Sequence, residues 1–173
     1  MEVEIKANCF ESTFSKIRSR LLKMKATKKK EKKQVDQYYN LPHMDLKGTN
    51  KYIRLRKEGK KAVFEYHVNL GKGLTKEEKT KIGDAKAFEK MFLEFGFRKL
   101  GKIEKIREVY ELEKFSIFLD KVTGVGVFIS VNTEGNKKNW IEKKQECINV
   151  LKQLGLTKDN ITNERLCEIA THK

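Results

Sequence analysis

The sequence predicts an α+β fold: an eight-stranded, closed antiparallel β-barrel with helices packed outside it. About eight strand-like segments occur along the 173 residues, and only two or three amphipathic helical segments separate them. No internal repeat, long linker or glycine-serine tract divides the chain, so we expect a single domain over residues 1–173. Eight antiparallel strands can close into a barrel wide enough for a small ligand. Closure is inferred here from the number and order of the segments.

The first half of the chain carries most of the strand-like segments. Residues 3–10 alternate in character and predict a strand, whereas residues 11–26 place apolar side chains at helical spacing. Pro42 fits a loop, and Glu58–Lys60 fit the turn of a hairpin. Residues 28–42 begin as a charge run and end in strand-like residues. The other strand-like segments of this half are residues 51–59 and 60–71 and, more weakly, 76–84.

The second half begins with an amphipathic helix over residues 84–97, for which Gly96 is a plausible stop. Three strand-like runs follow, and then a second amphipathic helix that ends at Gly155. These segments are residues 103–113, 115–122, 124–134 and 140–156. We expect the tail, residues 158–173, to return and pack on the body.

Composition limits the function classes. Lys and Arg number 39 against 24 Asp and Glu, which gives a net charge of +15. Such a charge favours anionic partners: nucleotides, polyphosphates, nucleic acid or a membrane surface. Cys9, Cys147 and Cys167 show no C-x-x-C spacing, so neither a disulfide framework nor a zinc site is supported. There is no signal peptide and no apolar run near the roughly 20 residues that span a bilayer, so we expect no membrane partner and a cytoplasmic protein.

Common catalytic motifs are missing from the sequence. It has neither a phosphate-binding loop of the form G-x-x-x-x-G-K-[ST] nor a G-x-G-x-x-G motif. His43, His67 and His172 are isolated, and we expect each to be a surface residue rather than a catalyst.

Charged residues instead recur at the two-residue period of a strand, which places them on one face. They are Glu2, Glu4, Lys6, Arg54, Arg56, Lys105 and Arg107. Either these faces meet water, or the apolar faces pack outward against helices and the charges point into the barrel. Buried cations need partners, and a triphosphate would suit arginine and lysine, with a divalent cation bridging it to Glu2 and Glu4.

The chain resembles the CYTH domains, or triphosphate tunnel enzymes, which include class IV adenylyl cyclases, thiamine triphosphatases and inorganic triphosphatases. Residues 2–6 (EVEIK) resemble the E-x-E-x-K signature of that family. Further similar segments follow in the family's order: DQYYN, YIRLR, IEKIREVY, FSIFLDKVTGVG and NERLCEI. Five segments in order make the resemblance specific for the fold.

The resemblance implies a role for each matching residue. Glu2, Glu4 and Asp120 would bind Mg²⁺ or Mn²⁺, and Glu4 and Asp120 would be the catalytic residues. The phosphate contacts would be Lys6, Arg54, Arg56, Lys105, Arg107 and Arg165. The ligand would be ATP, thiamine triphosphate or tripolyphosphate, and the reaction would be cyclisation to cyclic AMP or hydrolysis.

Three strands depart from the family pattern. Ser130 and Asn132 stand where family members usually carry carboxylates, and His67 stands where a lysine is usual. The acidic strand in mid-chain has thinned to KEEKTKIG. These changes raise the positive charge of the tunnel and weaken its metal side, so anion binding should survive them better than turnover.

Three hypotheses follow. The first is a metal-dependent enzyme that acts on a triphosphate, either a cyclase or a triphosphatase. The second is a binding protein that keeps the tunnel but has lost catalysis along with its metal-site carboxylates. The third is a nucleic-acid binder that uses the basic run at residues 25–33, although this run lacks the interleaved aromatic residues of single-strand binders. The sequence does not specify the oligomeric state, and a homodimer is compatible with it.

Overall fold

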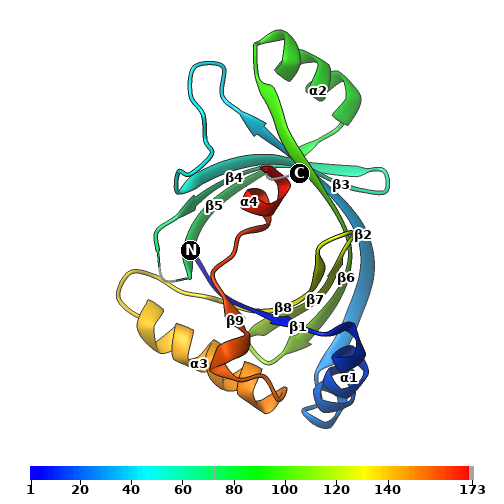
Figure 1. Ribbon diagram of the computed structural model, residues 1–173, viewed down its shortest axis with the longest axis vertical. Coiled ribbons are helices and arrows are strands. Elements are labelled where there is room, and N and C mark those ends of the chain that lie inside the picture. The colour runs from blue at the N-terminus through cyan, green and yellow to red at the C-terminus, as the bar shows by residue number, and fades with distance from the viewer. Residues whose placement is uncertain (72, 172–173) are drawn as a thin grey trace. The chain divides into compact units, whose positions relative to one another are not determined.

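The protein is an α+β fold built mainly from antiparallel strands (Figure 1). A computed structural model describes residues 1–71 and 73–171. Among these residues the strands are β1 Glu2–Cys9, β2 Thr27–Asn40, β3 Lys51–Glu58, β4 Lys61–Asn69, β5 Leu74–Ile82, β6 Arg98–Leu112, β7 Phe115–Val122, β8 Gly126–Glu134 and β9 Ile161–Thr162. The α-helices are α1 Phe14–Lys23, α2 Ala85–Glu94, α3 Trp140–Gln153 and α4 Leu166–Thr171. His172 lies outside the described residues.

The strand pairing closes on itself. The order is β5-β4-β3-β2-β6-β7-β8-β1, and β5 also pairs with β1 through Glu2–Thr75 and Val3–Leu74. The two-residue strand β9 adds to β1 at Lys6 and Ala7. The closed eight-stranded antiparallel barrel predicted from the sequence is therefore confirmed.

The contacts divide the chain into two compact units, which are described separately. Unit 1 comprises residues 1–32, 71–75 and 105–163, and unit 2 comprises residues 33–70, 76–104 and 164–173. The single domain over residues 1–173 stays a prediction.

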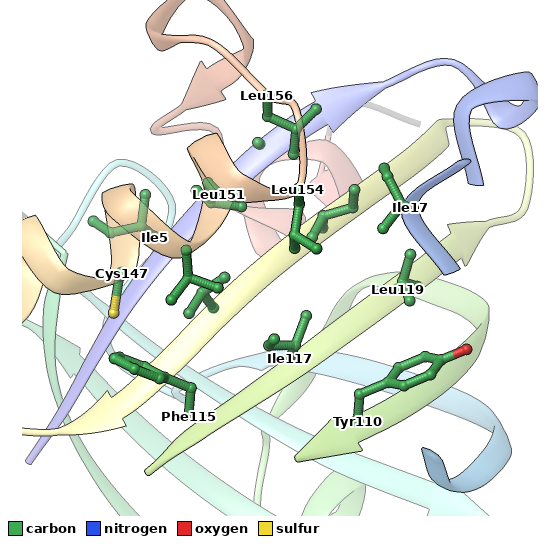
Figure 2. Close-up of a cluster of buried hydrophobic side chains, with 14 of the residues drawn as sticks. Ile5, Ile17, Tyr110, Phe115, Ile117, Leu119, Cys147, Leu151, Leu154 and Leu156 are labelled. Carbon is green, nitrogen blue, oxygen red and sulfur yellow. The ribbon is translucent and has the colours of Figure 1, made fainter. Parts of the chain in front are cut away.

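In unit 1, helices α1 and α3 pack on the apolar face of the strands. Val3, Ile5 and Ala7 of β1 alternate with polar residues, and all three are buried in this core. Figure 2 shows Ile5 of β1, Ile117 of β7 and Leu151 of α3 gathered in one cluster. Helix α3 runs alongside β1 and β8 (Figure 1). The strand period thus sends the apolar side chains to the helices and the charged ones to the opposite face.

In unit 2, α2 packs on the apolar face of the strands. Asp84 caps the helix by accepting hydrogen bonds from the backbone N–H groups of Lys86 and Ala87, each at 2.9 Å. Phe88 and Phe92 of α2 pack with Phe64 of β4, at ring-centroid distances of 5.2 and 5.0 Å. Aromatic contacts therefore hold α2 to the sheet.

Helix α4 lies close to β6 in the same unit. A Cβ atom added at Gly101 would stand 1.9 Å from the carbonyl oxygen of Ala170. The strand therefore needs a glycine at this position, because a methyl group would push the helix away.

The starts of β2 and β6 differ most from the sequence prediction. Strand β2 begins at Thr27, so the charge run that precedes the predicted strand-like residues lies within the strand, and β6 begins at Arg98, five residues before the predicted start at 103. Ion pairs help hold the lysines in place: Lys28 pairs with Glu108 at 3.1 Å, and Lys29 pairs with Glu111 at 2.9 Å. Hydrophobic periodicity could not signal this part of β2, because the exposed segment carries few apolar residues.

No helix among the described residues is long and apolar enough to cross a membrane. The cytoplasmic location stays a prediction.

The core of unit 1 makes a testable claim about stability. Ile117 is fully buried in it, so Ile117→Ala should lower the free energy of unfolding by about 2–5 kcal/mol through lost burial and a cavity. Urea denaturation measures this change. Ile141→Ala on α3, where the side chain is 66% exposed, is the control and should cost less than about 0.5 kcal/mol. Equal losses in the two variants would contradict the assigned core.

Candidate functional site

Each unit carries its own group of charged residues on the strand face opposite its apolar core. In unit 1 these are Glu2, Glu4, Lys6, Lys105, Arg107 and Asp120, and in unit 2 they are Asp36, Arg54, Arg56 and Glu65. The alternative of a simple solvent face does not hold for most of them, since Arg54, Arg56, Lys105, Asp36, Glu65 and Asp120 are all at most 9% exposed.

Strand β1 carries the acidic side of the unit 1 group. Glu2, Glu4 and Lys6 alternate with the buried Val3 and Ile5, so they share the face that points away from the helices. In the pairing with β8, Glu4 lies opposite Asn132 and Lys6 lies opposite Ser130. The sequence-predicted alternation of β1 is therefore present.

Asp120 of β7 organises the cations of β6. Arg107 donates to both carboxylate oxygens of Asp120, from Nε at 2.6 Å and from Nη2 at 2.5 Å. Lys105 Nζ donates to the same carboxylate at 3.2 Å. Burial alone would raise the pKa of Asp120, but Arg107 and Lys105 hold it well below its usual range. The carboxylate is therefore ionised at neutral pH and holds both cations in position.

Glu4 is ionised for a similar reason. Burial favours its neutral form, but the charges of Lys6 and Arg107 and a hydrogen bond from Ser130 outweigh burial and lower its pKa. Ser130, which replaces a carboxylate of the family pattern, thus lies on the same face as Glu4 and stabilises its charge.

Asn132 lies beside these carboxylates and is 5% exposed. Its Nδ2 donates to Glu2 Oε1 at 2.8 Å, while its Oδ1 has no hydrogen-bond partner among the described residues. Within residues 1–71 and 73–171, no cluster of three or more His, Cys, Asp or Glu side chains could hold a metal. A hard divalent ion here would therefore depend on Glu2 and Glu4 with a neutral oxygen, a donor set that suits Mg²⁺ or Mn²⁺.

In unit 2, Asp36 and Glu65 pair with the two arginines of β3. Arg56 donates to Asp36 from Nε at 2.6 Å and from Nη2 at 2.7 Å. Arg54 Nε donates to Glu65 Oε2 at 2.7 Å. Burial raises the pKa of Glu65, but Arg54, His67 and Arg56 together bring it far below its usual value. Asp36 and Glu65 were not among the predicted site residues, although the strand-period spacing of Glu65 and His67 could have signalled the second of them.

The prediction that His67 is a surface residue is wrong, whereas His43 is exposed as expected. His67 is 4% exposed, and its ring stacks on that of Tyr52 with 4.4 Å between the ring centroids. Its Nε2 lies 2.9 Å from Glu65 Oε2, and its Nδ1 lies 3.8 Å from Glu77 Oε2. Since a carboxylate only accepts, Nε2 carries the proton. Burial lowers the pKa of His67 in spite of Glu65, so the ring is neutral at pH 7.

Arg165 lies just before α4 in unit 2, on a separate set of partners. Its Nη2 donates to the carbonyl oxygen of Thr49 at 3.0 Å, and the guanidinium also pairs with Glu168. The residue lines a small cavity together with Tyr38, Tyr52 and Cys167. Asp36 and Glu65 pair with Arg54 and Arg56, whereas Arg165 pairs with Glu168. The guanidinium of Arg165, which is predicted to contact phosphate, therefore has different neighbours from that of Arg54.

The exterior basic run on β2 is the candidate surface for nucleic acid. Residues 28–31 and 33 are exposed, and Lys28 forms ion pairs with both Glu31 and Glu108. Part of the local charge is therefore neutralised, and binding of nucleic acid through this run stays a prediction.

Known proteins give a consistent picture of the fold. The chain matches the CYTH domain family over residues 1–163. A Methanocaldococcus jannaschii protein provisionally named an adenylate cyclase is 30% identical, and the match covers 98% of each chain.

Two solved structures show the same fold at lower identity. A Pyrococcus horikoshii protein is 24% identical with a TM-score of 0.86, covering 98% of this chain and 99% of its own. A Hippeastrum protein, provisionally named an adenylyl cyclase and described as having a dominant triphosphatase activity, is 19% identical with a TM-score of 0.63, covering 90% and 88%.

The buried His67 predicts a pH dependence of stability. Its pKa is lowered from 6.5 in the folded state, so the unfolded state binds the proton first as the pH falls. The contribution of His67 to the free energy of unfolding is thus present above pH 6.5 and lost as the pH falls below it. Urea denaturation from pH 7 downward measures the loss, which should shrink in His67→Gln. The carboxylates affect stability in a separate pH range. The pKa of Glu108 is lowered from 4.5 to about 2, so its contribution to the free energy of unfolding is lost only below pH 4.5.

The control for this prediction is His43→Gln, because His43 is exposed. It should keep the pH dependence of the wild type. An identical pH dependence in His67→Gln and the wild type would contradict the role of His67.

Proposed function

The chain belongs to the CYTH domain family, and from this premise we propose that it binds a triphosphate-containing small molecule together with Mg²⁺ or Mn²⁺ and acts on it as an adenylyl cyclase or a triphosphatase. The CYTH family is a metal-dependent triphosphate tunnel family. The substrate is proposed to be ATP, thiamine triphosphate or tripolyphosphate.

The observation that carries the proposal is the burial of arginine and lysine on barrel strands. Arg107 is held bidentately by Asp120, and Arg56 is held bidentately by Asp36. A guanidinium has five N–H donors, more than one carboxylate accepts, and its fork geometry matches phosphate oxygens. Holding the guanidinium in advance lowers the entropy lost when a phosphate binds.

The proposed roles follow the positions of the predicted residues. The phosphate contacts are Lys6, Arg54, Arg56, Lys105, Arg107 and Arg165. Glu2 and Glu4 would hold the metal, whose chemistry is to neutralise phosphate charge and polarise the phosphorus centre. Asp120, which the resemblance offered as a further metal ligand and catalytic residue, is instead proposed to position Lys105 and Arg107, since both of its oxygens accept hydrogen bonds from these cations.

The chain's own residues favour the transition state through charge. In hydrolysis a water oxygen would attack the terminal phosphorus, and in cyclisation the ribose 3′-oxygen would attack the α-phosphorus as pyrophosphate leaves. Negative charge grows on the phosphate oxygens in either case, and fixed cations that need no rearrangement stabilise it. Glu4 has a lowered pKa, so it is ionised and is better suited to hold a cation than to donate a proton.

A second candidate is a protein that binds the triphosphate without turnover. Ser130 and Asn132, both neutral, favour it, because they lie on the face that carries Glu2 and Glu4. Fewer carboxylates weaken metal binding and leave the cations unchanged.

Binding is tested with tripolyphosphate by calorimetry. Arg107→Ala should weaken its affinity by about 10-fold to 100-fold, since a charge-assisted hydrogen bond contributes about 1.5–3 kcal/mol. Arg18→Ala is the matched control, because Arg18 likewise donates to both oxygens of a buried carboxylate, Glu108. It should bind tripolyphosphate as the wild type does. Equal affinity of the wild type and Arg107→Ala would contradict the proposed contact.

Turnover is tested with ATP, thiamine triphosphate and tripolyphosphate in the presence of Mg²⁺ or Mn²⁺. Release of phosphate identifies a triphosphatase, and cyclic AMP with pyrophosphate identifies a cyclase. Glu4→Gln should reduce either rate by about 100-fold or more, since metal coordination and charge stabilisation are both impaired. Binding without any product would favour the second candidate, and the absence of both would sink the proposal.

A further inference from the structure

Resting on the proposed function, we propose that the side-chain oxygen of Asn132 is a neutral third ligand of the divalent metal held by Glu2 and Glu4. The sequence pattern marks this position as a lost carboxylate. The structure instead places there a buried amide oxygen without a hydrogen-bond partner among the described residues, on a side chain that contacts Glu2 and lies opposite Glu4 in the strand register.

The orientation of the amide follows from its neighbour. Glu2 is a carboxylate and can only accept, so the NH₂ group of Asn132 must face it, as the 2.8 Å contact from Nδ2 to Glu2 Oε1 requires. Oδ1 is thereby the amide atom that stays without a hydrogen-bond partner among the described residues. It is the oxygen, and not the nitrogen, that remains available to an incoming cation.

An unpartnered oxygen at this depth needs an explanation. Asn132 is only 5% exposed, and such an atom is rare in native proteins because its lost hydration costs free energy. A leucine of similar size would fill the volume without that cost. The amide is therefore better suited to binding something than to packing.

The surroundings select a cation as the partner. Glu4 lies directly opposite Asn132 in the β1–β8 register, and Glu2 contacts its amide. Two carboxylates and an amide oxygen are hard ligands of the kind that Mg²⁺ and Mn²⁺ accept. A soft metal such as Cu(I) would find no sulfur ligand among these three residues.

A neutral ligand also fits the local charge. Among the six charged residues of the unit 1 group, three carboxylates (Glu2, Glu4 and Asp120) face three cations (Lys6, Lys105 and Arg107). A carboxylate at position 132 would add a negative charge beside Glu2 and repel it. The amide contributes an oxygen without that charge, so the bound metal keeps more of its positive charge for a phosphate.

Mn²⁺ titration, followed by electron paramagnetic resonance without any triphosphate, tests the ligand directly. Asn132→Leu should weaken Mn²⁺ binding by about 10-fold to 100-fold, whereas Asn132→Asp, which keeps an oxygen and adds charge, should bind Mn²⁺ at least as tightly as the wild type. Asn149→Asp on the exposed side of α3 adds the same charge elsewhere and should bind as the wild type does.

Unchanged Mn²⁺ affinity in Asn132→Leu, or weaker affinity in Asn132→Asp, would overturn the inference. The second variant keeps it falsifiable if the leucine variant does not fold. Tripolyphosphate binding measured by calorimetry without metal separates the two proposals. If the wild type binds tripolyphosphate but Asn132→Leu does not change the affinity for Mn²⁺, the role of Asn132 as a ligand is rejected and the proposed function stands. If the wild type does not bind tripolyphosphate, the proposed function is rejected.

Discussion

Pairing of buried opposite charges is the interaction on which the polar faces of the strands depend. A lone arginine or lysine in these positions would be strongly destabilising, because burial removes its hydration. Asp120 serves two cations of unit 1, and Asp36 and Glu65 serve two arginines of unit 2. Asp120 and Glu65 are kept ionised by these same partners, so these pairs support the charge state that they need.

The same pairing shapes the way in which an anion would bind. An incoming phosphate would meet guanidinium groups that are already oriented, and it would share their donors with the carboxylates. Within the polar group of unit 1, the carboxylates of Glu2, Glu4 and Asp120 equal the cations of Lys6, Lys105 and Arg107 in number, so a divalent metal and a triphosphate complement each other there. His67 differs from the arginines and lysines because it is neutral at pH 7. Its ring stacks on that of Tyr52, so it contributes an aromatic contact rather than a positive charge.

Much of the fold could be predicted from the sequence because strand alternation is a local signal. Val3 and Ile5 between Glu2, Glu4 and Lys6 indicated the two faces of β1 correctly, and ordered segments indicated the barrel. The lysine-rich start of β2 could not be predicted, since exposed strands show little apolar periodicity. Burial of His67 depends on Tyr52 and Glu77 from neighbouring strands, and the open oxygen of Asn132 depends on Glu2. Such cross-strand contacts cannot be read from local spacing.

The two faces of β1 also constrain how this segment can evolve. Its apolar residues pack on α3 and its charged residues serve the polar group, and the two sets alternate without interruption over residues 2–7. Substitutions can alter either set one residue at a time. An insertion or deletion of one residue would exchange the faces, sending carboxylates into the core and isoleucine toward the cations. The length of this strand should therefore drift far more slowly than its composition.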